Sequence, residues 1–81
     1  MNRFTSVAAQ DRFVVVASMA GGTNLGTFDC ITEAHARITR HIEHVCNLFP
    51  GEEVQICQEG PSVVCDWTNG QHITYTVTAS R

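Results

Sequence analysis

Lysine is absent from this chain, and its five basic residues are arginines spread thinly over 81 residues. The eight acidic residues are equally dispersed, and the formal net charge is −3 at pH 7. So few cations cannot neutralise a track of phosphates, so direct nucleic-acid binding is not expected. The scattered acids likewise exclude the dense negative surface of a DNA mimic. Arginine in place of lysine is typical of GC-rich coding sequences and favours a bacterial or phage source.

Long apolar runs are also missing. The longest, residues 13–20, ends at Gly21 and Gly22, whereas a membrane-spanning helix needs about 20 apolar residues. Asp11 and Arg12 interrupt the approach to this run, so the match to a secretory signal peptide is poor. We therefore expect a cytoplasmic protein, in a bacterial host cell.

The chain lacks the short motifs that mark catalytic and metal sites. It contains neither GxSxG nor GxxxxGK, and Gly21-Gly22 precedes a predicted strand where a phosphate-binding loop would lead into a helix. Its His and Cys residues do not form the paired CxxC or HxxxH spacing of a zinc site. We expect no catalytic residue, no bound metal and no cofactor, so the protein is not predicted to be an enzyme.

Four cysteines are present, namely Cys30, Cys46, Cys57 and Cys65. Without a convincing signal peptide we expect reduced thiols that pack as small apolar side chains. One pair keeps a second interpretation open, because Cys57 and Cys65 fall on adjacent predicted strands. If they oppose each other, a disulfide between them would staple the hairpin.

The composition, 43% hydrophobic and 16% charged, is that of a globular protein. We expect residues 1–81 to form a single domain of the α+β class. Residues 12–19 are rich in Val and Phe and predict a strand, residues 25–28 predict a strand that returns beside it, and residues 2–8 are the candidate for one more.

One amphipathic helix is predicted from residue 31 to residue 49, because apolar side chains recur there on a single stripe. The stripe consists of Ile31, Ala34, Ile38, Ile42, Val45 and Phe49. Asp29 or Cys30 takes the N-cap position, and Pro50 with Gly51 ends the helix. His35 and His41 flank the stripe, while His44 points to solvent. The exposed charges Glu33 with Arg37, and Arg40 with Glu43, are spaced for weak ion pairs.

Three antiparallel strands follow the helix, at residues 53–58, 62–68 and 71–78. Asn69-Gly70 between the last two predicts a two-residue type I′ turn, since both residues tolerate positive φ. That turn places Trp67 opposite His72, and Cys65 opposite Thr74. The predicted architecture is thus an antiparallel sheet of four to five strands packed on one helix, in the order ββαβββ.

The same register assigns the side chains to two sheet faces. The face that receives the helix carries Val64, Ile73, Tyr75 and Val77. The other face carries Val63, Cys65, Trp67, His72, Thr74 and Thr76, and leaves Trp67 partly exposed as a candidate interface anchor. Because a single bulge would exchange the two faces, a covered Trp67 is the alternative interpretation.

A strand pair that leads through residues 26–38 (GTFDCITEAHARI) into one helix and then three antiparallel strands resembles the layout of several small phage anti-CRISPR proteins. The resemblance covers nearly the whole chain and consists of size, element order and composition. It implies a non-catalytic inhibitor that docks on a Cas effector complex and blocks target recognition or nuclease recruitment.

The residues themselves also favour a domain that acts by binding a protein. The predicted partner-binding residues are Trp67, Asp66, His72, Glu33, Arg37, Arg40 and Glu43. An antitoxin-like or regulatory homodimer is the alternative, formed through the open sheet face or through the last strand, whose Thr74, Thr76 and Thr78 would line a sheet edge. A weak nucleic-acid or metal binder is a third hypothesis.

Overall fold

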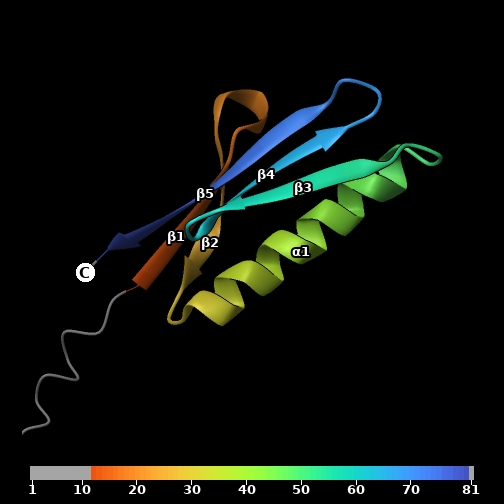
Figure 1. Cartoon of the computed structure of the whole chain (residues 1–81). Coiled ribbons are helices and arrows are strands. Elements are labelled where there is room, and N and C mark those ends of the chain that lie inside the picture. The colour runs from red at the N-terminus through yellow and green to blue at the C-terminus, as the bar shows by residue number, and fades with distance from the viewer. Residues whose placement is uncertain (1–11, 81) are drawn as a thin grey trace, which may run out of the picture.

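The computed structural model describes residues 12–80, in which a five-stranded antiparallel sheet packs on one helix (Figure 1). The elements are β1 Arg12–Ala17, a 3-10 turn η2 Met19–Gly21, β2 Thr23–Phe28, α1 Ile31–Leu48, β3 Val54–Glu59, β4 Ser62–Trp67 and β5 His72–Ser80. The predicted α+β fold and its order ββαβββ are confirmed. The further strand predicted at residues 2–8 lies outside the described residues.

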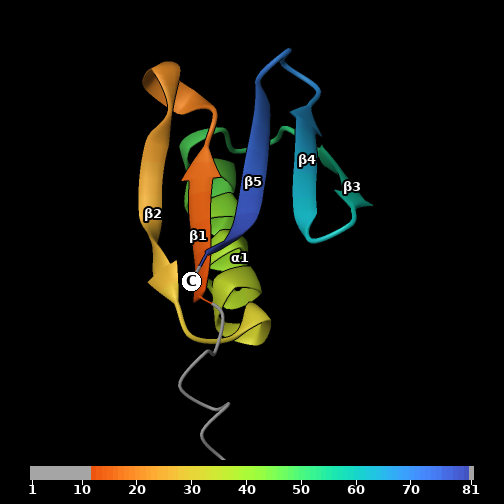
Figure 2. The ribbon, with the colours of Figure 1, turned by 90° about the vertical axis from the view of Figure 1, so that its left-hand side faces the viewer.

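The last strand of the chain occupies the centre of the sheet. The strand order is β2-β1-β5-β4-β3, so β5 joins the β1–β2 hairpin to the β3–β4 hairpin (Figure 2). The prediction that Thr74, Thr76 and Thr78 line a sheet edge is therefore wrong. The hairpins were predictable because their strands are consecutive in the sequence. The pairing of β1 with β5 joins residues far apart in the chain, and no local pattern indicates it. The edges of the described sheet are β2 and β3.

The β4–β5 turn differs from the predicted type I′ turn. Gly70 N donates to Trp67 O at 3.0 Å, and Trp67 N donates to Gln71 O at 2.8 Å. Gly70 has φ 94°, whereas Asn69 does not have positive φ. The loop therefore contains Thr68, Asn69 and Gly70, with glycine at the left-handed position of a G1 bulge. Asn69 instead accepts a hydrogen bond from Gln71 N through its side-chain oxygen, at 2.9 Å.

The longer loop shifts the pairing by one residue from the predicted register. Cys65 lies opposite Ile73, where Thr74 was predicted, and Asp66 lies opposite His72. Because side chains alternate across a strand, a shift of one residue moves every side chain of one strand to the other face. The predicted faces are wrong for β4: its Val63, Cys65 and Trp67 share the helix-covered face with Ile73, Tyr75 and Val77 of β5.

The core lies between this face and α1. Its buried side chains are Val15, Ala17, Ala34, Ile38, Ile42, Val45, Val63, Cys65, Trp67, Ile73, Tyr75 and Val77. Trp67 is only 3% exposed, so the expected exposed anchor is wrong and the covered alternative holds. Burial of large apolar side chains of this kind contributes about 1.5–3 kcal/mol each.

Helix α1 follows the predicted stripe. Ala34, Ile38, Ile42 and Val45 are buried, and Ile31 and Phe49 pack against the core from the two ends. Cys30 is the N-cap residue, with extended backbone and no side-chain cap hydrogen bond. Glu33 lies in the first turn, where the helix dipole favours a negative charge.

The β1–β2 hairpin contains a bulge. Val15 pairs with Gly26 and Val16 pairs with Asn24, so Leu25 is the extra residue. Strand β2 starts at Thr23, two residues before the predicted start. Gly26 has φ 130°, and its N–H donates to the side chain of Asn24 at 2.7 Å. The bulge lets Leu25 pack against the core, and it bends this edge of the sheet.

Candidate functional site

An open groove of about 440 Å³ lies between α1 and the β3 side of the sheet. Its apolar lining consists of Ile38, Ile42, Ile56 and Val63, and its polar lining consists of His35, Thr39, Glu43 and Gln58. In Figure 2 the helix runs behind β1 and β5, while β4 and β3 extend beyond it. One helix is too narrow to cover five strands, so the outermost strand faces this groove uncovered.

Ile56 is the residue that shows this lack of cover most clearly. It pairs with the fully buried Cys65 and therefore points to the helix side of the sheet, yet it remains 54% exposed. A single exposed isoleucine is ordinary on a protein surface. Here it adjoins two buried isoleucines, Ile38 and Ile42, across the groove. The groove can therefore receive one apolar side chain of a partner.

Within residues 12–80, no strand lies along the outer side of β3. Thr68 N donates to Glu53 O at 2.9 Å, so the polar groups of Glu53 point to β4. In a regular antiparallel ladder, residues two apart share this direction, and β3 pairs with β4 without a bulge. The N–H and C=O groups of Val54, Ile56 and Gln58 consequently point away from β4. No strand of the described sheet pairs with them.

Two hydrogen bonds hold the end of the groove. His35 Nε2 lies 2.8 Å from Pro61 O, which ties the β3–β4 turn to the first half of α1. Gln58 Nε2 donates to Gly60 O at 3.1 Å within that turn. The turn is thus anchored on the helix side, and the edge strand keeps a defined position beside the groove.

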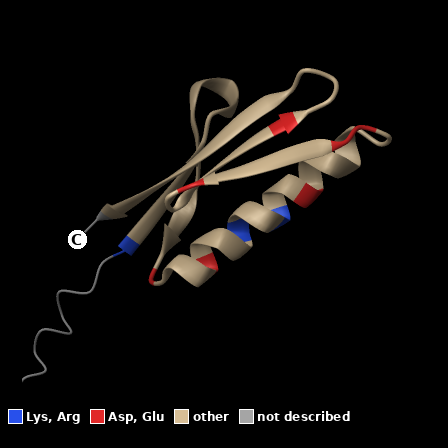
Figure 3. Ribbon diagram, in the orientation of Figure 1, with Lys and Arg blue, Asp and Glu red and all other residues tan. Residues whose placement is uncertain are grey.

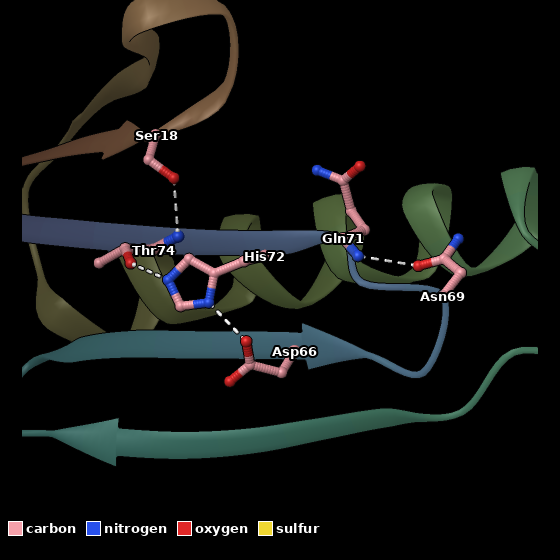
Figure 4. Close-up of polar contacts among 6 residues, drawn as sticks. All are labelled: Ser18, Asp66, Asn69, Gln71, His72 and Thr74. Carbon is pink, nitrogen blue, oxygen red and sulfur yellow. Dashed lines mark hydrogen bonds and ion pairs between the residues drawn. The ribbon is translucent and has the colours of Figure 1, made fainter.

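The open face of the sheet carries a small polar network instead of a groove (Figure 4). His72 Nδ1 lies 2.5 Å from Asp66 Oδ1, and His72 Nε2 lies 3.3 Å from Thr74 Oγ1. Thr74 N donates to Ser18 Oγ at 2.9 Å. Asp66 and His72 face each other directly across β4 and β5. These contacts tie strand ends and turns together, and the side chains stay exposed to solvent.

The predicted site residues do not meet at one place. Asp66 and His72 are adjacent on the open face, whereas Trp67 is buried on the opposite face. Glu33, Arg37, Arg40 and Glu43 lie on α1, and of these only Glu43 lines the groove. Among residues 12–80, neither Glu33 with Arg37 nor Arg40 with Glu43 forms an ion pair.

The β3 residues that border the groove were not among the predicted site residues. Val54, Ile56 and Gln58 alternate with Gln55 and Cys57 in a stretch without a charge. Edge strands are normally protected by charges, proline or bulges. The available signal was a run of five residues without a charge, residues 54–58, with apolar side chains at Val54 and Ile56. Its importance depends on β3 being an edge, which only the sheet order reveals.

A histidine and a tyrosine meet where α1 crosses β5. His41 Nδ1 lies 2.7 Å from Tyr75 Oη, and the two rings pack edge to face. Burial, with smaller contributions from nearby Arg37 and His44, lowers the pKa of His41. Burial also raises the pKa of Tyr75. The pair is therefore neutral near pH 7, and it packs as part of the interior.

The cysteines are free and differ in environment. Burial raises the pKa of Cys65 to about 11, so its thiol is a poor nucleophile. Cys57 is exposed on the edge strand and pairs with Val64, whereas Cys65 pairs with Ile56. Cys57 and Cys65 thus point to opposite faces, and the possible disulfide between them is wrong. Within residues 12–80, no three His, Cys, Asp or Glu side chains cluster as metal ligands would.

Comparison with protein-family models, with characterised proteins and with solved structures gives no match for this chain. In the part of the chain that the structure describes, no helix combines the length and apolar character needed to cross a bilayer.

Proposed function

We propose that this protein is a non-catalytic binding domain that takes up an extended segment of a protein partner along the outer side of β3. The observation that carries the proposal is the free, regular edge of β3 beside an apolar groove. In strand addition, backbone hydrogen bonds supply affinity and pockets for alternate side chains supply selectivity. Here the unpaired backbone groups of β3 lie next to a groove that can take up a side chain.

The spacing of the outward groups fits this mode of binding. Val54, Ile56 and Gln58 offer three pairs of backbone donors and acceptors on one side of the strand. Their side chains lie on the helix side of the sheet, where Ile56 and Gln58 line the groove. A partner strand beside β3 would direct every second side chain into the same groove.

An inhibitor of a Cas effector complex is the specific form of this proposal. That form rests on the resemblance in element order and size to small phage anti-CRISPR proteins. Such an inhibitor needs no catalytic group: it acts by occupying a surface that the effector uses for target DNA or for nuclease recruitment. An antitoxin-like domain would use the same edge on a different partner.

Affinity capture with matched variants tests the proposal. The tagged protein is incubated with lysate of CRISPR-bearing bacteria, bound proteins are identified by mass spectrometry, and the identified protein is purified for affinity measurements. Ile56→Asp places a charge beside the groove, and Thr27→Asp places the same charge on the other edge strand, where Thr27 is exposed. We expect at least tenfold weaker binding for Ile56→Asp and unchanged binding for Thr27→Asp.

Equal binding of the same partner by the wild type and Ile56→Asp would refute the role of the β3 edge. Loss of binding with a charge on the open face, for example Thr76→Asp, and not with Ile56→Asp would move the interface there. Recovery of Cas subunits would support the inhibitor form, and recovery of a small toxin would favour the antitoxin-like form.

A further inference from the structure

The charge around β3 narrows the chemistry of the segment that the edge can bind. From His41 to Ser80 the chain contains no Lys or Arg. The acidic residues of this stretch are Glu43, Glu52, Glu53, Glu59 and Asp66. Figure 3 shows the described basic residues at the start of β1 and on α1, and none on β3, β4 or β5. The charged residues of β3, β4 and the turns next to them are therefore all acidic.

Two of these acids bracket the edge strand. Glu53 directly precedes β3 and Glu59 is its last residue. Both are exposed, and neither forms an ion pair with any residue in the range 12–80. Since side chains alternate along a strand, Glu53 and Glu59 lie on the open-face side, whereas Ile56 midway between them lies on the groove side.

From this arrangement we propose that the strand-addition site selects a basic extended segment, with an apolar residue in the middle and Lys or Arg three residues to each side. This inference rests on the proposed function and adds the chemistry of the partner. The central residue, placed opposite Ile56, enters the groove. The residues three positions away lie opposite Glu53 and Glu59, with their side chains on the same side as the two carboxylates.

A second copy of this chain fits the edge less well than a basic segment does. If two copies pair antiparallel with Ile56 opposite Ile56, Glu53 of each copy lies opposite Glu59 of the other. Like charges directly opposite each other destabilise a strand pair. If the pairing is centred on Cys57, Glu59 lies opposite Gln55, which removes the repulsion and supplies no attraction. Charge complementarity thus favours a basic partner.

A synthetic peptide tests the inference without knowledge of the natural partner. The probe is acetyl-KVTLTVK-amide, whose palindromic sequence fits β3 in either strand direction. Its leucine would face Ile56, and its lysines would face Glu53 and Glu59. The matched control is acetyl-EVTLTVE-amide, which keeps the apolar and backbone groups and reverses the charge. Binding is measured by amide chemical-shift changes in the full chain at low and at high salt.

We expect the basic peptide to shift the amide signals of residues 53–59 and to bind at least tenfold more tightly than the acidic peptide. Opposite-charge pairs at exposed sites contribute about 0.2–1 kcal/mol each, so the loss of two such pairs in the double variant Glu53→Gln with Glu59→Gln should weaken binding of the basic peptide roughly two- to thirtyfold. High salt should also weaken the binding of the basic peptide, because it screens the attraction between its lysines and the two carboxylates. The paired substitution Asp29→Asn with Glu33→Gln, at two acidic residues that do not line the groove, is the control for net charge.

Three results would overturn the inference, and they separate it from the proposed function. Equal binding of both peptides at residues 53–59 would refute the basic preference and leave strand addition standing. Absence of any peptide-induced shift at β3, together with a natural partner that tolerates Gln58→Pro, would refute both. Self-association in sedimentation experiments that Gln58→Pro abolishes would identify a second copy as the occupant.

Discussion

The two edge strands of this sheet differ in how far their unpaired backbone groups are protected from pairing with another chain. Strand β2 is bulged at Leu25, and the Gly26 N–H bonds to the side chain of Asn24. Strand β3 is regular, and among residues 12–80 no side chain forms a hydrogen bond with its outward backbone groups. A bulge and a locally satisfied N–H are common means of blocking unwanted strand pairing. Among the described strands, β2 thus has the protected outer edge and β3 the unprotected one.

The two edges also differ in their cover. Leu25 and Phe28 of β2 pack against the core, which α1 shares, whereas Ile56 of β3 faces a groove. The helix therefore stabilises the β2 side and leaves the β3 side accessible. In this fold, apolar packing is concentrated on the β2 side of the sheet, and exposed apolar surface lies on the β3 side.

The largest effect on stability should come from proline on the inward-facing side of β3. Cys57→Pro removes an N–H that points to β4, with a loss of about 1–3 kcal/mol in the free energy of unfolding. Gln58→Pro removes an outward N–H and should cost less than about 1 kcal/mol, because edge strands accept proline there. Chemical denaturation measures both variants. Equal losses would show that β3 has no free edge.

A smaller loss of stability is expected from a substitution in the bulged edge strand β2. Gly26→Ala places a Cβ 3.1 Å from Phe28 Cζ at a φ of 130°. That backbone region strains any residue other than glycine, so we expect a loss of about 1–2 kcal/mol. Gly22→Ala, at a similar φ of 119° and with only Val16 Cγ1 near the added Cβ, at 3.9 Å, is the control for backbone strain alone. A loss no larger than that of the control would remove the close approach to Phe28 as a cause.

The smallest expected effect is on the pH dependence of stability. It should arise from His41, which contacts the central strand β5, and not from either edge strand. The pKa of His41 is lowered in the folded protein, so below the ordinary value of about 6.5 the unfolded chain binds the proton more readily. Stability should thus fall as the pH decreases through that value. His41→Gln should reduce this dependence, whereas His72→Gln, on the open face, should leave the contribution of His41 in place. Thermal unfolding between pH 5 and pH 8 measures this pH dependence. Identical profiles for the wild type and His41→Gln would show that His41 does not cause it.

Helix α1 was predictable because its signal is local and repeated. Its apolar stripe, its N-cap at Cys30 and its end before Pro50 agree with the structure within one residue. All five described strands were predicted at approximately correct positions for the same reason. Their β-branched runs and the turn residues that bound them are local features of the sequence.

The faces of β4 and the sheet order were not predictable. Asn69-Gly70 fits both a two-residue type I′ turn and the end of a three-residue loop, and only φ at Asn69 distinguishes them. The choice determines whether Trp67 is buried. The groove in turn depends on β3 being an edge, and that follows from the pairing of β1 with β5, residues far apart in the chain.

The central position of β5 also has a consequence for how the protein is made. The β1–β2 and β3–β4 hairpins can each form from neighbouring residues, but only β5 connects them. During synthesis on a ribosome, the sheet therefore cannot be completed until the residues up to Ser80 have left the exit tunnel. Until then the nascent chain exposes the inner edges of both hairpins, and unpaired strand edges of this kind promote aggregation.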